Sequence, residues 1–300
     1  MIHNQLLQRF EIHFLVDYGT VAIPADRRSI GVDKGYTEAF YDSDGQAHGK
    51  NLGKVATNKS VRVAWPFGHR ICSKNRNRGK LWALHRKLEK INPAKSARIL
   101  KNNLSRKTEN RRYRKNQSEL TAIIGAASKS LFDGESLKVF AVREAWPTAS
   151  DLTQPIRNKR QSKTMSLKLN SWMKGKMRDS LQKWANWTGS VVTEIQPSYT
   201  SQVDSVTGTL LGKRSGDSFT RFDGVVLQAD HNAAKNILVR GTDKEISRYM
   251  NKTEVQAVLL RRTARFLKGM GLSLADAVEL GWLDSKHSQT RAFKELLTGM

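Results

Sequence analysis

The chain has 300 residues, of which 38% are hydrophobic, so it can form one large domain or two modest ones. Its net charge of +25 and isoelectric point near 10.3 point to nucleic acid as partner, although a ribosome-like or merely basic protein has the same charge balance. Cys72 is the only cysteine, which excludes an internal disulfide and a zinc site built from thiolates. Because no stretch reaches the roughly 18 apolar residues of a membrane span, we expect no membrane partner and a cytoplasmic location.

The first 69 residues are predicted to form mainly β-strands. Alternating apolar residues between 10 and 23 suggest two short strands, and residues 54–64 suggest another. The run Gly31-Val32-Asp33-Lys34-Gly35 places a carboxylate inside a strand, and Asp44-Gly45 predicts the turn of its hairpin. A carboxylate on a rigid strand needs a chemical reason, and one such reason is a metal ion beside a phosphodiester.

A strongly basic segment follows, from residue 70 to about 130. Apolar residues from Leu81 to Ile91 recur at helical spacing, and Asn92-Pro93 ends that helix before a second one begins. A charge run is usually a solvated surface, but this excess has one sign and cannot be neutralised by internal pairing, so we favour a helical hairpin that faces a polyanion. The residues expected to bind nucleic acid are Lys74, Arg76, Arg78, Arg86, Arg106, Arg111, Arg112 and Arg114.

Residues 131–196 show the pattern strand, helix, strand. Residues 137–144 alternate as in a β-strand and end in a carboxylate, Glu144. Residues 167–187 have the apolar stripe of an amphipathic helix, and 190–195 predict a short strand.

The remaining residues form three predicted parts. Residues 197–228 contain several glycines and short apolar runs, as a small irregular insert would. Asp230 opens a helix over 230–238, where an aspartate could also serve only as the N-cap. Residues 241–300 are predicted to be helical.

Three acids are the proposed catalytic and metal-binding set: Asp33, Glu144 and Asp230. Carboxylates are needed because Mg²⁺ and Mn²⁺ prefer hard oxygen ligands. Two such ions about 4 Å apart would hold the attacking water and the leaving oxygen in line. From residue types alone, Asp42, Asp44 and Glu38 are equally good candidates.

Several motifs, in their order along the chain and in their residues, resemble those of the RuvC nuclease of TnpB proteins and type V CRISPR effectors. Residues 31–35 with Asp44-Gly45 resemble the first motif, and Asp230-His231-Asn232-Ala233-Ala234-Lys235-Asn236-Ile237 resembles the third. Val142–Trp146, which contains Glu144, is a looser match to the middle motif. Thr200-Ser201-Gln202 resembles the entry to the zinc-ribbon insert of the family. The resemblance covers roughly residues 12 to 239.

This resemblance implies an α/β fold: an RNase H-like (RuvC) mixed sheet flanked by helices, with a basic helical hairpin insertion and a small degenerate ribbon insert. The nuclease would comprise residues 26–69, 131–196 and 229–240, with the hairpin at 70–130 and the ribbon at 197–228. Residues 1–25 would be a remnant of a wedge-like region, and 241–300 a C-terminal helical region.

The resemblance further implies an RNA-guided, Mg²⁺- or Mn²⁺-dependent DNA endonuclease that binds guide RNA and target DNA. The alternative is a guide-RNA- and DNA-binding protein without cleavage, acting as a repressor or as part of a split effector. A third option is a guide-free RuvC-like nuclease.

The chain departs from the family pattern in two places. Its insert has Asp204, Thr207, Thr220 and Asp223 where the family has four zinc-binding cysteines, so we expect no structural zinc and an insert held by Leu210, Leu211, Phe219 and Phe222. Only about thirty residues precede Asp33, which suggests a natural miniature, a truncated reading frame, or a chain that needs a separate recognition chain or a second copy.

Overall fold

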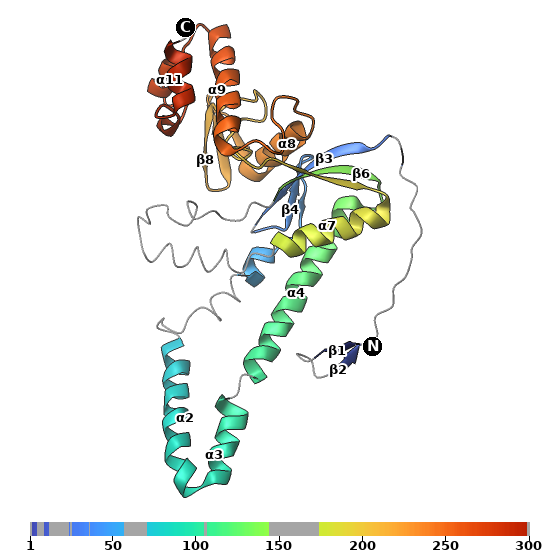
Figure 1. Cartoon of the computed structure of the whole chain (residues 1–300), viewed down its shortest axis with the longest axis vertical. Coiled ribbons are helices and arrows are strands. Elements are labelled where there is room, and N and C mark those ends of the chain that lie inside the picture. Colours follow the sequence, from blue (N-terminus) through green and yellow to red (C-terminus); the bar gives the residue numbers. More distant parts are fainter. Residues whose placement is uncertain are drawn as a thin grey trace.

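The computed structural model describes residues 2–4, 9–11, 24, 26–35, 37–56, 71–104, 107–143 and 174–298 (Figure 1). Its strands are β1 (Ile2–Asn4), β2 (Arg9–Glu11), β3 (Arg28–Lys34), β4 (Phe40–Asp42), β5 (Ala47–His48), β6 (Leu137–Val142), β7 (Val191–Ile195), β8 (Gly212–Ser215), β9 (Ser218–Arg221) and β10 (Val226–Gln228). Its α-helices are α2 (Ile71–Ile91), α3 (Pro93–Ile99), α4 (Lys107–Phe132), α7 (Lys174–Thr188), α8 (Ala229–Gly241), α9 (Lys252–Gly269), α10 (Leu274–Glu279) and α11 (Arg291–Thr298).

A five-stranded mixed sheet with the order β5-β4-β3-β6-β7 forms the centre of the molecule. The central strand β3 pairs in parallel with β6, which pairs in parallel with β7, while β4 and β5 complete the other side in antiparallel pairing. Helices cover both faces, as a sheet with buried parallel strands requires (Figure 1). The prediction of a mixed sheet flanked by helices is confirmed.

The hairpin that follows the predicted carboxylate strand differs from the expectation. The Asp44-Gly45 turn joins β4 to β5, because the N–H of Asp42 donates to the carbonyl oxygen of Gln46 and Gly45 adopts φ +90°. The carboxylate strand β3 pairs in antiparallel with β4, so the chain first reverses direction between these two strands and not at Asp44-Gly45. The strand predicted over 54–64 begins in a short helical turn at 52–56, and the rest of it lies outside the described residues.

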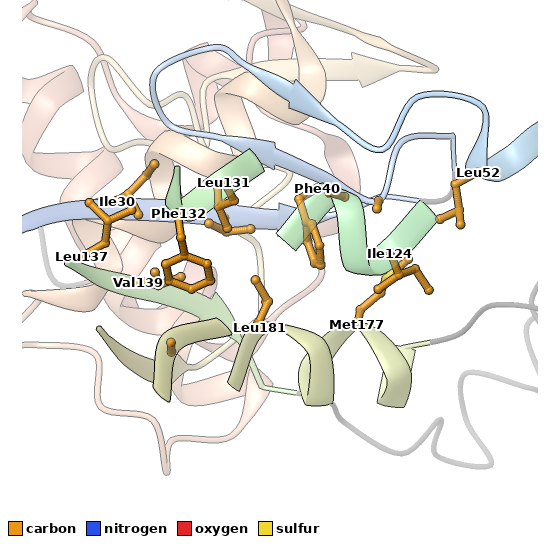
Figure 2. Packing of buried hydrophobic residues seen from close by; sticks show 14 of the residues in the cluster. Ile30, Phe40, Leu52, Ile124, Leu131, Phe132, Leu137, Val139, Met177 and Leu181 are labelled. Carbon is orange, nitrogen blue, oxygen red and sulfur yellow. The ribbon is translucent and has the colours of Figure 1, made fainter. Parts of the chain in front are cut away.

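One face of the sheet is covered by α4 and α7. Ile30 of β3 and Val139 of β6 lie in a core with side chains from both helices and from the β4 hairpin (Figure 2). The helices contribute Leu120, Ile124, Leu131, Phe132, Met177 and Leu181. The second half of α4, which the sequence analysis assigned to the basic insertion, therefore belongs to the main core, because its apolar positions have the sheet to pack against.

The opposite face of β3 is covered by α8, and the contact has no room for a side chain. A Cβ atom placed on Gly31 would lie 2.2 Å from the carbonyl oxygen of Ala234 and 2.5 Å from the backbone nitrogen of Leu238. Glycine at this position lets the helix backbone touch the strand. Gly31 and Asp33 point to the same face of the sheet because they are two residues apart, so Asp33 also faces α8.

The basic segment forms a helical arm that extends away from the sheet (Figure 1). Helix α2 is followed by α3, which Asn92 caps through the N–H of Lys95, and then by a π-helical turn over Leu100–Leu104. Among the side chains that the structure describes between residues 79 and 104, most apolar ones are not buried: Leu84 and Ile91 are exposed, and only Ile99 and Leu104 are enclosed. The predicted hairpin is therefore a surface element.

The C-terminal helices pack onto the insert. The buried side chains of Leu210 and Leu211 from the insert form one core with apolar residues of α9, α10 and α11. Phe222 is half-buried beside Phe266 and Trp282, whereas Phe219 is fully buried. The prediction that residues 241–300 are helical is thus confirmed for α9, α10 and α11, and these helices pack against the insert. Within the described ranges, no helix combines the length and apolar character needed to cross a bilayer.

We predict that Gly31→Ala lowers the free energy of unfolding by about 1–3 kcal/mol, because the added methyl group meets helix backbone that cannot rotate away. Urea unfolding monitored by circular dichroism measures this. The matched control is Gly125→Ala in α4, where a Cβ atom meets nothing within 4 Å, and which should gain about 0.5–1 kcal/mol. Equal effects of the two substitutions would contradict the close approach.

Candidate active site

Two of the three predicted acids face each other across the contact between β3 and α8. Along β3, Asp33 lies two residues beyond Gly31, a rise of about 6.6 Å. Along α8, Asp230 lies one turn before Ala234, a rise of about 5.4 Å. Since Gly31 touches Ala234, the matching steps bring Asp33 and Asp230 together.

The electrostatics of Asp33 record this proximity. The pKa of Asp33 is raised from 3.8 to about 7. Burial of the side chain is the largest cause, and the negative charge of Asp230 is the second. The positive charges of Arg214 and Lys34 act in the opposite direction. A carboxylate in this position is costly to ionise unless a cation neutralises it.

Asp230 is not used as a helix cap. The side chain of Gln228 caps α8 by accepting the N–H of His231, so Asp230 sits in the first helical turn with its carboxylate directed elsewhere. Its Oδ1 accepts a hydrogen bond of 2.8 Å from Arg214, a residue of β8 in the insert. The N-cap interpretation left open by the sequence is therefore excluded.

Two further residues, Arg214 and Glu38, lie near Asp230, although no sequence motif identified them as part of the site. Arg214 also donates from Nε to the carbonyl oxygen of Gly216, which orients its guanidinium. Burial and the charges of Asp230 and Asp217 raise the pKa of Glu38, so these acids lie near one another. Across the residues that the structure describes, however, no group of three or more Asp, Glu, His or Cys side chains is arranged to hold a metal ion. No sequence signal marks Arg214, because a single arginine in a basic chain is not distinctive.

The other two acids that residue types left open have structural roles. The buried Asp42 accepts hydrogen bonds from the N–H groups of Asp44 and Gln46 and binds His48 at 2.9 Å. Burial opposes ionisation of Asp42, but the hydrogen bond from His48 and the backbone bonds lower its pKa. Asp44 pairs with Arg28 at the surface. Both therefore maintain the hairpin.

Glu144 lies outside the described residues, so its assignment stays a prediction. The strand before it ends beside Asp33: Val32 is paired with Ala141, and the N–H of Arg143 donates to the carbonyl oxygen of Ile195 at 2.9 Å. The carboxyl ends of the parallel strands β3 and β6 thus share one edge of the sheet.

The remaining polar residues of the third motif anchor the helix and the insert. His231 is part-buried, with Nε2 at 3.2 Å from the carbonyl oxygen of Ser43, and so braces the hairpin. The amide of Asn232 donates to the carbonyl oxygen of Val203, and the amide of Asn236 donates to those of Thr200 and Val203. These contacts give His231, Asn232 and Asn236 structural roles.

The predicted nucleic-acid residues are described only in part. Arg86 and Arg114 are exposed on α2 and α4. Arg106 lies outside the described residues, as do the side chains of Lys74, Arg76, Arg78, Arg111 and Arg112. Between residues 79 and 104, Glu89 is the only acid, so the exposed charges of Arg86, Lys87, Lys90, Arg98 and Lys101 remain in excess.

Comparison with known proteins agrees with the motif resemblance. Residues 175–237 match the family model described as Cas12f1-like, TNB domain, and this region includes Asp230 and Arg214. The solved "Cas12f1-sgRNA-target DNA complex" matches at 13% identity and a TM-score of 0.34, over 73% of this chain and 51% of that chain. The chain thus spans about half the length of that protein. Curated proteins gave no match. The resemblance to the TnpB and type V effector family is confirmed through the TNB match.

We predict that Asp33→Asn stabilises the metal-free protein in a pH-dependent way. The raised pKa means that the folded state favours protonated Asp33, so the penalty is absent below pH 3.8, grows up to about pH 7 and is complete above it. The substitution should therefore add stability of about 4 kcal/mol at most above pH 7 and little near pH 4.

Thermal denaturation of parent and variant across this pH range, in buffer stripped of divalent ions, checks the effect. Asp42→Asn is the control of opposite sign, because the lowered pKa of Asp42 stabilises the fold at neutral pH. A Tm difference for Asp33→Asn that does not change with pH would show that Asp33 is not under electrostatic strain.

Proposed function

Starting from the Cas12f1-like domain over residues 175–237, we propose that the chain is an RNA-guided, divalent-metal-dependent DNA endonuclease. Its site would consist of Asp33, Asp230 and Glu144. The observation that carries the proposal is the placement of Asp33 against Asp230, with the pKa of Asp33 raised to about 7 by burial and by the neighbouring charge.

The strand order supports an RNase H-like assignment of the fold. In this chain the acid-bearing central strand β3 has antiparallel strands on one side and parallel strands on the other, and α8 crosses it with the second acid. The two acids therefore come from sequence-distant segments that only the packed sheet and helix can unite.

The residues present fit a divalent cation. Asp33 and Asp230 supply hard oxygen donors, and their mutual repulsion would be relieved by a cation between them. When bound, Mg²⁺ or Mn²⁺ would supply an activated water and stabilise the leaving oxygen of the phosphodiester. Two carboxylates are present in the described part of the site, and Glu144 is proposed as the third.

Arg214 is placed to act on the phosphate. Its guanidinium lies at 2.8 Å from Asp230 and keeps further N–H donors, which suit the paired oxygens of a phosphate. In the proposed reaction Arg214 holds the Asp230 carboxylate in orientation and offers positive charge to the scissile group.

The helical arm would contact the nucleic-acid backbone. Its exposed basic side chains supply the sequence-independent attraction that a guide RNA and its target DNA need, while base pairing would select the sequence. The match to the Cas12f1-like TNB domain supports these partners.

The alternative is binding without cleavage. The observation that favours it is the ion pair between Arg214 and Asp230, because an internal cation already neutralises one of the two acids. A cleavage assay on site variants separates the two functions.

We predict that Asp33→Ala and Asp230→Ala each reduce Mg²⁺-dependent DNA cleavage by at least about a hundredfold while leaving RNA affinity within about twofold. The acids would bind metal and not the RNA backbone, which is the physical reason for this separation. The assay uses the protein copurified with its RNA. Asp179→Ala, which removes an exposed acid on α7, is the control and should cleave as the parent does. Parental cleavage by both site variants would refute the site, and an active protein without bound RNA would favour a guide-free nuclease.

We predict that replacing Arg86, Lys90 and Arg98 with alanine weakens RNA binding and reduces the slope of log affinity against log salt by about 2–3. Fluorescence anisotropy at several salt concentrations measures this slope. The charge-matched control replaces Arg261, Arg265 and Lys268 on α9, which are also exposed. If both triple variants change the slope equally, binding reflects net charge and not the arm.

A further inference from the structure

The insert contains two short segments that each carry one aspartate and one threonine and lead into a tight turn. Asp204–Thr207 and Thr220–Asp223 each span four residues and are each followed by a glycine with positive φ, Gly208 at +69° and Gly224 at +82°. In the first turn the N–H of Gly208 donates to the carbonyl oxygen of Asp204, and in the second the N–H of Gly224 donates to that of Arg221. The first bond closes a turn of five residues and the second a turn of four, so both turns are tight but their backbones differ by one residue.

The side chains in these turns do not fit a zinc ion. Two carboxylates and two hydroxyls replace the thiolates that a structural zinc site favours. Thr220 is exposed on its strand, whereas Asp204 is fully buried. Both carboxylate oxygens of Asp204 are also already occupied: Oδ1 accepts the N–H of Val206 at 3.0 Å, and Oδ2 accepts the hydroxyl of Thr207 at 2.9 Å.

The guanidinium of Arg221 lies between the two turns. Its Nε donates to Oδ2 of Asp204 at 3.0 Å, and its Nη1 lies 2.8 Å from Oδ2 of Asp223. Asp223 uses its other oxygen, Oδ1, for the N–H of Val225 at 3.1 Å. In both turns, therefore, one carboxylate oxygen of the aspartate accepts a hydrogen bond from the backbone of its own turn, and the other oxygen contacts the guanidinium of Arg221. The Arg221 side chain is 13% exposed and that of Asp204 is fully buried, so this half of the bridge is shielded from solvent, whereas the Asp223 side chain is 37% exposed.

We propose that Arg221 replaces a structural metal ion as the cross-link of the insert, and that it thereby positions Arg214 beside Asp230. A guanidinium can perform this role because it is permanently charged and presents several donors in a fixed plane. The second part of the proposal rests on the proposed function, whereas the first part does not.

A series of polar contacts starts at Asn232 of α8, passes through the insert, and ends at Asp230 of the same helix. Asn232 accepts the N–H of Ser205 at 2.9 Å and so fixes the first turn to the helix. Arg221 connects this turn to the end of β9, where it pairs with Gly212 of β8. Arg214, two residues after Gly212 on β8, forms an ion pair with Asp230 of α8. Removing the cross-link would free the β8–β9 hairpin to pivot and take Arg214 away from the site.

The first test concerns the cross-link alone. The full chain, expressed with added zinc, should contain no stoichiometric zinc by mass spectrometry, and a zinc-selective chelator at constant Mg²⁺ should leave its Tm unchanged. Arg221→Ala should lower the Tm by on the order of 10 °C, because it leaves the buried Asp204 unpaired. The control, Arg291→Ala, breaks an exposed pair with Glu295 and should shift the Tm by about 2 °C or less.

If Arg221→Ala does not fold, Arg221→Lys decides the matter, since lysine keeps the charge but cannot bridge two carboxylates with a planar fork. Amide hydrogen exchange over residues 200–225 should become at least about tenfold faster in this variant, with the core of β3 and β6 unchanged. Zinc bound by the parent, a chelator-sensitive Tm, or parental exchange in Arg221→Lys would overturn the proposal.

The second test concerns positioning. Arg221→Lys should slow cleavage, and the double variant with Arg214→Ala should be no slower than Arg214→Ala alone, because both changes act through the same guanidinium. Independent, multiplicative losses would overturn the positioning role. If the parent does not cleave, the proposed function and the positioning role both fail, and the exchange and zinc measurements still decide the cross-link.

Discussion

The close packing of α8 on β3 at Gly31 is the constraint on which the rest of the structure depends. A residue with any side chain at this point would separate the helix backbone from the strand, since even a Cβ atom would lie 2.2 Å from the carbonyl oxygen of Ala234. Because the spacing of two strand residues is close to that of one helical turn, the same contact sets Asp33 opposite Asp230. The position of α8 on the sheet and the meeting of the two acids thus depend on the same steric requirement.

Bringing two acids together has an electrostatic cost, and the structure shows how that cost is distributed. The pKa of Asp33 rises to about 7, so this acid bears much of the penalty, whereas Asp230 is stabilised by Arg214. Asp42, nearby in sequence, shows the opposite behaviour because hydrogen bonds satisfy its charge. A carboxylate with a raised pKa on β3 and one with a lowered pKa on β4 form the contrast expected between a site prepared for a cation and a side chain that only holds a turn.

The insert and the C-terminal helices form a second unit of stabilisation, with an apolar core of their own. Leu210 and Leu211 share a core with α9–α11, while the Arg221 bridge joins the two polar turns. Apolar burial and a shielded ion pair together can replace the constraint that a small β-ribbon otherwise obtains from a metal. This arrangement lets the insert present Arg214 to the site from a rigid support.

By itself, the sequence determined the kind of fold and the acids worth testing. Alternating residues over 137–144 predicted the strand β6, helical spacing over 81–91 predicted the arm, and residues 230–238 predicted α8, since such patterns are local and repeat with the period of the element. Taken without the family resemblance, the residue types could not separate Asp33 from Asp42 or Asp44 and could not exclude that Asp230 serves only as an N-cap, and no pattern revealed Arg214 or Arg221. Those distinctions depend on burial and on partners that lie far away in sequence, and only the tertiary structure, through the contact of α8 with β3 and the docking of the insert, decided them.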